Sequence, residues 1–136
     1  MKSIWINLPV KDVKKSKAFF EAIGFTLNPN FGMETSASFL IGDAKVVMML
    51  FPEEDFKGFV RHEISDTNKG SEILLNLDAQ SRDEVDAMAK TVSKVGGKIF
   101  AEPEESQGWM YVLGFEDLDG HRWSMLYMDP EKMSKK

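Results

Sequence analysis

A histidine beside a tight acidic turn is the first residue of this sequence that can move a proton near neutral pH. His121 follows Asp117-Leu118-Asp119-Gly120, and one other histidine, His62, occurs in the 136 residues. A general acid or base role suits the imidazole of His121, although hairpin histidines are more often simply solvated. His62 lies in a charged segment, where a solvated role is still more typical. The two aspartates resemble a carboxylate pair, but turn formation alone explains both.

Aromatic and polar residues in two expected strands offer a second kind of chemistry, the binding of a small molecule. Strand alternation puts Trp5 and Asn7 on one face, and Glu72 and Asn76 on another. An aromatic wall with a few polar groups is typical of a small-molecule pocket. The competing interpretation, which a single tryptophan favours, is that Trp5 belongs to the core.

Two further aromatic residues, Trp109 and Tyr111, follow an expected loop. From that position they could close over a ligand, and position is the only argument for this role. Trp123 has no such argument and is expected in the core.

The composition limits the class of protein. A hydrophobic fraction of 43% with ten Phe is ample for a core, and a formal charge of -5 leaves no net basic charge for nucleic acid. The absence of cysteine excludes disulfides, thiolate metal sites and cysteine nucleophiles. The N-terminal apolar run meets charge at Lys11, too early for a signal sequence or a membrane span. We therefore expect a cytoplasmic protein with no nucleic-acid or membrane partner.

The elements that position these residues are expected to occur twice in the same order. The first half predicts a strand, a helix and three strands, over residues 3–10, 13–23, 25–28, 37–41 and 45–51. Asp12 can cap the helix and Gly24 can end it, while Pro9 favours an edge or a bend for the first strand. The second half repeats the order over residues 72–78, a helix that Ser81 opens, 98–101, 110–115 and 122–128. The resulting prediction is one domain over 1–136: module one 1–51, an insertion 52–70, module two 71–128 and a polar tail 129–136.

Two stretches of the chain carry a family resemblance. Leu8-Pro9-Val10-Lys11-Asp12, with Ser16-Lys17-Ala18-Phe19-Phe20 and Gly24-Phe25, resembles the opening strand and helix of the vicinal oxygen chelate (glyoxalase/bleomycin resistance/dioxygenase) superfamily. Asp117-Leu118-Asp119-Gly120-His121-Arg122-Trp123 resembles its closing hairpin. Asn7-Leu8-Pro9-Val10, Asn28-Pro29 and Ser81-Arg82-Asp83-Glu84-Val85-Asp86 are also similar to the subgroup of predicted lactoylglutathione lyases.

The resemblance implies an α+β fold in which two βαβββ modules form a curved mixed sheet around a cavity. Many members hold a divalent metal there, on ligands from the first and last strand of each module. Counted along the motifs, these four positions fall on Trp5, near Val46, and on Glu72 and Ser124. An indole, a valine and a neutral hydroxyl are poor metal ligands, so Glu72 is the one anion of the set.

Two hypotheses of function follow. The first is a metal-free small-molecule binding protein without a cofactor, whose ligand contacts Trp5, Asn7, Asn76, Trp109, Tyr111 and Ser124. The alternative is a metal-dependent lyase or isomerase of the lactoylglutathione lyase kind, with Glu72 and His121 available as catalytic groups for proton transfer. In several members of the superfamily two chains complete the paired sites, so the resemblance also implies a homodimer.

Overall fold

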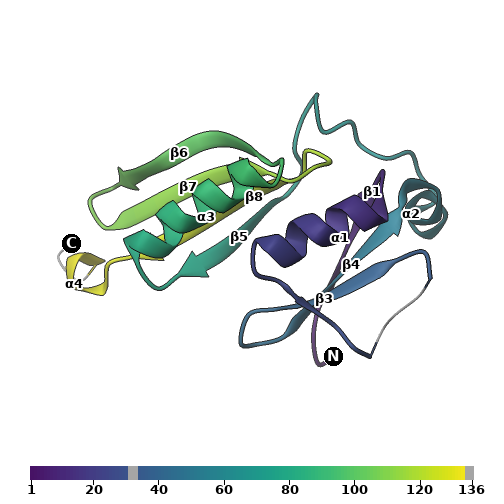
Figure 1. The fold of residues 1–136 in the computed structure, drawn as a ribbon, viewed down its shortest axis with the longest axis horizontal. Helices are drawn as coiled ribbons and strands as arrows, with labels where there is room; N and C mark the ends of the chain where they lie inside the picture. Colours follow the sequence, from purple (N-terminus) through teal and green to yellow (C-terminus); the bar gives the residue numbers. More distant parts are fainter. Residues whose placement is uncertain (31–33, 134–136) are drawn as a thin grey trace. The chain divides into compact units, whose positions relative to one another are not determined.

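The computed structural model describes residues 1–30 and 34–133, and the chain divides into two compact units, residues 1–66 and 67–136. Each unit contains a strand, a helix and three further strands, so the predicted repeat is confirmed (Figure 1). Each unit forms a four-stranded sheet of its own, and neither sheet closes into a barrel. The association of the two units into a single domain stays a prediction.

The first unit consists of β1 (Trp5–Val10), α1 (Val13–Ala22), β2 (Thr26–Leu27), β3 (Ala37–Ile41), β4 (Val46–Pro52) and α2 (Glu53–Val60). Its strands lie in the order β1-β4-β3-β2, with β1 parallel to β4 and the other pairs antiparallel. The edge position of β1 explains why Pro9 is tolerated in it, as predicted. Residues 31–33 of the predicted first module lie outside the described part.

Local sequence explains where α1 begins and what it covers. The side chain of Asp12 accepts a hydrogen bond from the backbone N–H of Lys15 at 3.1 Å, and Gly24 follows the helix with a φ of 110°. Phe20 packs against Phe39 of β3, with ring centroids 5.9 Å apart. The helix therefore covers the sheet face that carries Phe39.

The second unit consists of β5 (Leu74–Ala79), α3 (Arg82–Lys94), β6 (Lys98–Ser106), β7 (Met110–Glu116), β8 (Arg122–Met128) and α4 (Pro130–Met133). Its strand order, β5-β8-β7-β6, repeats that of the first unit, again with the first and last strands of the unit parallel. The backbone N–H of Glu84 donates to the Ser81 hydroxyl at 3.1 Å, so the predicted cap is confirmed. Figure 1 shows α3 lying along one face of this sheet.

Two strands of the second unit differ from the predicted boundaries. β5 begins at Leu74 rather than at residue 72, because its partner β8 begins at Arg122, opposite Leu74, and the residue before Arg122 belongs to a turn. β6 continues to Ser106 rather than ending at residue 101. It is the edge strand, and register shifts on either side of Ala101 let it pass Pro103.

The insertion and the tail each carry a short helix. The insertion predicted over 52–70 contains α2, and the tail predicted over 129–136 contains α4. Residues 134–136 lie outside the described part. Within the described residues, no helix has the length and apolar character needed to cross a membrane.

Candidate functional site

The first sheet carries Trp5 and Asn7 on the face opposite α1. Trp5 pairs with Val47 and Asn7 with Met49, and these positions alternate with the ones that pack on α1. We call this surface the Trp5 face (Trp5, Asn7, Val47 and Met49). The Trp5 side chain is 51% exposed, so the interpretation of this residue as core is wrong.

The insertion helix packs on part of the Trp5 face. Met49, Val47 and Phe51 form an apolar cluster with Phe56 of α2, and the rings of Phe51 and Phe59 lie 4.9 Å apart. Within the first unit, α2 therefore covers the end of the face that carries Phe51. The half-exposed Trp5 and the exposed Asn7 remain accessible within this unit.

The second sheet brings Asn76 and Ser124 together on the face opposite α3. The two residues are register partners in β5 and β8, and the Ser124 hydroxyl donates a hydrogen bond to Oδ1 of Asn76. Ser124 is buried, whereas Asn76 is exposed. Trp123 points to the other face and is fully buried, as predicted.

An arginine stacked on a phenylalanine lies on the same face as Asn76. The Arg122 guanidinium is 4.2 Å from the centroid of the Phe100 ring, and its Nη2 forms an ion pair of 3.2 Å with Oε2 of Glu116. Gly114, the register partner of Ser124, makes room for the ring: a Cβ there would lie 2.5 Å from Phe100. We call this surface the Asn76 face; it consists of Leu74, Asn76, Phe100, Gly114, Glu116, Arg122 and Ser124.

The sequence did not identify Arg122, Phe100, Gly114 and Glu116 as parts of a site. Side chains alternate between the two faces along a strand, so the sequence could have placed Arg122 on the same face as Ser124, two residues away. The position of Phe100 over Gly114 depends on the shifted register of β6, which no sequence signal gives.

The structure changes two of the four positions assigned by counting along the motifs. In the first unit the parallel pairing of β1 with β4 begins at Trp5 and Val47. In the second unit the equivalent pairing of β5 with β8 begins at Leu74 and Arg122. Leu74, not Glu72, is therefore the counterpart of Trp5, and Glu72 lies exposed before β5. By the same register Met49, rather than Val46, is the counterpart of Ser124.

The residues at these positions do not fit a divalent metal. Trp5, Met49, Leu74 and Ser124 supply an indole donor, a thioether, an alkyl group and a neutral hydroxyl, where zinc or a hard cation takes imidazole, thiolate or several oxygens. Among residues 1–30 and 34–133, no group of three or more His, Asp or Glu side chains is placed to hold a metal ion.

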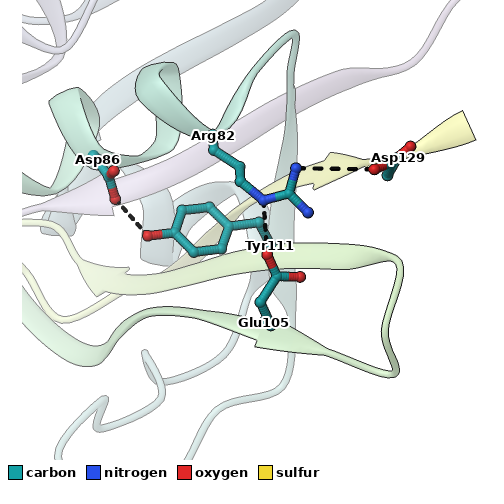
Figure 2. Close-up of polar contacts among 5 residues, drawn as sticks. All are labelled: Arg82, Asp86, Glu105, Tyr111 and Asp129. Carbon is teal, nitrogen blue, oxygen red and sulfur yellow. Dashed lines mark hydrogen bonds and ion pairs between the residues drawn. The ribbon is translucent and has the colours of Figure 1, made fainter. Parts of the chain in front are cut away.

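Tyr111 lies on the α3 side of the second sheet, away from Asn76 and Ser124. Its hydroxyl donates to Oδ1 of Asp86 at 2.7 Å (Figure 2). This hydrogen bond raises the pKa of the Tyr111 phenol. Arg82 forms a hydrogen-bonded ion pair with Glu105 at 2.7 Å and approaches Asp129 at 3.9 Å. Trp109 lies in the turn before β7, where its carbonyl accepts from the N–H of Asp129 at 2.8 Å.

The acidic turn is built around a buried Asp117. One of its carboxylate oxygens accepts from the backbone N–H groups of Asp119 and His121, and the other accepts from Nε1 of Trp123, each at 3.0 Å. Turn formation is thus confirmed as the role of Asp117. Burial raises the pKa of its carboxyl, although His121 and the hydrogen bonds act in the opposite direction. His121 is half-buried beside it, and its role in proton transfer stays a prediction.

Comparisons with known proteins agree with the repeated fold. The family described as bleomycin resistance protein-like N-terminal matches residues 2–42. A hypothetical protein of S. aureus is 31% identical, with 93% of this chain and 94% of that chain covered and a TM-score of 0.83. A glyoxalase/bleomycin resistance protein/dioxygenase family enzyme of Burkholderia phytofirmans is 17% identical, with 91% and 96% covered and a TM-score of 0.78.

A third similar structure is the fosfomycin resistance protein FosX of Listeria monocytogenes, complexed with Mn(II) and a sulfate ion. It is 21% identical, with 97% of this chain and 94% of that chain covered and a TM-score of 0.70. No curated protein matches the sequence significantly. The paired βαβββ units and mixed sheets define the α+β architecture of these structures. The chain therefore has the fold of solved glyoxalase/bleomycin resistance/dioxygenase structures, which are also called vicinal oxygen chelate proteins, and its residues 2–42 match the bleomycin resistance protein-like family.

Proposed function

We propose that this protein binds small molecules without a metal, and that the Trp5 face of the first unit and the Asn76 face of the second unit are two separate candidate binding surfaces. The observation that carries the proposal is the strand register, which puts Trp5, Met49, Leu74 and Ser124 where the superfamily resemblance implies metal ligands. Exposed aromatic surface and a small set of polar groups remain on these faces, and that combination suits a small organic ligand.

A calorimetric titration of nickel and zinc into chelator-stripped protein tests the metal-free part of the proposal. No heat of specific binding is expected, because none of the four side chains is an anion or an imidazole. Tight binding near one metal per chain contradicts the proposal. In that case Glu72→Gln and His121→Ala are the first variants to make. Neither residue is one of the four named above, and a carboxylate and an imidazole could both supply metal ligands.

A panel of aromatic and cationic compounds, followed by tryptophan fluorescence, tests the ligand-binding part. A bound compound is expected to quench Trp5, whose indole is half exposed. The variant Trp5→Phe should lose that response. Trp109→Phe separately tests the proposed contact of Trp109, and a response that survives both substitutions contradicts a role for either residue. Failure of the whole panel to change the fluorescence or raise the melting temperature contradicts the function.

The alternative is a metal-dependent lyase or isomerase of the lactoylglutathione lyase kind. The structural similarity to FosX, which was complexed with Mn(II), favours it. Glu72 and His121 would transfer the proton in this alternative. Turnover of the methylglyoxal–glutathione adduct with nickel, zinc or magnesium would support it, and the absence of turnover with all three metals contradicts it.

We also propose that the protein is cytoplasmic and that it forms a homodimer. The proposal of a dimer rests on the family resemblance, which implies sites that two chains complete. Light scattering on the purified chain measures the mass directly. A dimer mass is expected, and a monomer mass over the whole concentration range contradicts the proposal.

A further inference from the structure

Hydrogen bonding fixes the polarity of the Asn76 amide. The Ser124 hydroxyl donates to Oδ1 of Asn76, which uses the acceptor side of the amide. The Nδ2 group then remains as a pair of N–H donors on an exposed side chain. The centre of the Asn76 face therefore offers hydrogen-bond donors rather than acceptors.

Arg122 adds further donors beside this amide. Arg122 and Ser124 alternate along β8 and point to the same face, next to their partners Leu74 and Asn76. One guanidinium nitrogen, Nη2, is in the ion pair with Glu116, whereas a guanidinium has five N–H donors in all. The Phe100 ring, stacked at 4.2 Å, holds the plane of the group.

Carboxylates outnumber cations on the sheet face around these donors. Glu116 forms the ion pair with Arg122 and is the register partner of Lys98, while Asp78 and Glu104 reach the same face as the partners of Leu126 and Val112. An added carboxylate would therefore meet three carboxylates and two cations, and a neutral acceptor avoids that excess of negative charge. The apolar surface beside the donors comes from Leu74 and Phe100, which are 57% and 40% exposed.

We propose that the Asn76 face binds a neutral compound with a carbonyl-type oxygen. The oxygen accepts hydrogen bonds from Nδ2 of Asn76 and from the Arg122 guanidinium, while the apolar body of the ligand lies on Leu74 and Phe100. This inference rests on the proposed small-molecule function and names the class of ligand that its second face selects.

Three probes with one aromatic body test the chemistry: benzamide, benzoate and benzylamine. Titrations are followed by ¹H–¹⁵N NMR of the Asn76 side-chain amide and of Nε–H of Arg122. Benzamide is expected to shift both signals, with benzoate and benzylamine at least about tenfold weaker, the ratio typical of one lost or unpaired hydrogen bond.

Two substitutions make the test specific. Asn76→Asp replaces the donors by a charged acceptor, so benzamide affinity should fall about tenfold or more and benzylamine affinity should rise. Asn68→Asp introduces the same charge in an exposed turn outside the sheet and should leave the benzamide affinity unchanged. The amide spectra of both variants also show whether they are folded.

The outcomes separate this inference from the proposed function. Tighter binding of benzoate than benzamide, or benzamide affinity that survives Asn76→Asp, overturns the inference. Shifts confined to residues around Trp5 overturn it as well, but leave a small-molecule binding protein. Absence of a shift at Asn76 with all three probes also overturns it, while the wider panel read by fluorescence decides the proposed function.

Discussion

Nε1 of Trp123 donates a hydrogen bond of 3.0 Å to Oδ2 of Asp117, and both residues are buried. The Asp117 carboxylate accepts with its other oxygen from two backbone N–H groups of the turn. The Trp123 ring in turn stacks on Phe115, with centroids 6.3 Å apart. The Asp117 side chain thus joins the turn between β7 and β8 to Trp123 in the core beneath α3. Trp123 lies directly before Ser124 in β8.

Asp117→Asn should destabilise the protein, because an amide has only one acceptor oxygen. If that oxygen accepts from the backbone N–H groups of Asp119 and His121, the amide nitrogen faces Nε1 of Trp123. Two N–H donors then oppose each other without an acceptor. The expected loss of unfolding free energy is about 1–3 kcal/mol, the cost of a buried unpaired donor. Urea denaturation measures it, with Asp43→Asn, in an exposed turn, as the control that should change little. Equal stability of the two variants contradicts the proposed role.

The stability contributed by Asp117 should depend on pH. Burial raises the pKa of its carboxyl in the folded chain above the unfolded value of about 3.9. The folded state therefore holds the proton more strongly, and the contribution is fully present below the unfolded pKa and lost as pH rises through the folded pKa. The stability of the wild type relative to Asp117→Asn should fall across this window. A ¹³C titration of the Asp117 carboxyl checks the direction, and a midpoint below about 3.9 contradicts it.

The phenol of Tyr111 should ionise at a higher pH than that of an ordinary tyrosine. The hydrogen bond to Asp86 favours the protonated phenol and raises its pKa, with burial acting in the same direction. The chain has two tyrosines, so an ultraviolet titration can resolve a late transition. Asp86→Asn should move that transition to lower pH, whereas Asp83→Asn, exposed on the same helix, should leave it in place. A late transition that survives Asp86→Asn assigns the shift to another cause.

Gly114→Ala should displace Phe100 from Arg122. A Cβ at residue 114 would lie 2.5 Å from the Phe100 ring, and that ring is the exposed part of an edge strand, so it can move. We expect a loss of about 1–3 kcal/mol, the usual cost of overpacking. In the background of Phe100→Ala the same substitution should cost nothing, because the clash is absent. Denaturation of the four chains gives the coupling energy, and additive effects contradict the packing argument.

The sequence alone determined the repeated βαβββ order and the caps of both main helices. These features depend on contacts between residues that are close along the chain, such as the hydrogen bonds of Asp12 with Lys15 and of Ser81 with Glu84. Alternation also placed Trp5 with Asn7, and Trp123 opposite Ser124. The turn chemistry of Asp117 was equally local.

Only the tertiary structure decided which residues share a site. Parallel pairing of β5 with β8 brought Asn76 to Ser124, and it replaced Glu72 by Leu74 as the counterpart of Trp5. Tyr111 turned to Asp86 rather than to a ligand face. A one-residue change of register moves a side chain to the other face of a sheet, and register is set by partners distant in sequence. Helix caps lie within one turn of chain and could be predicted, whereas the Asn76 face depends on strand pairing and could not.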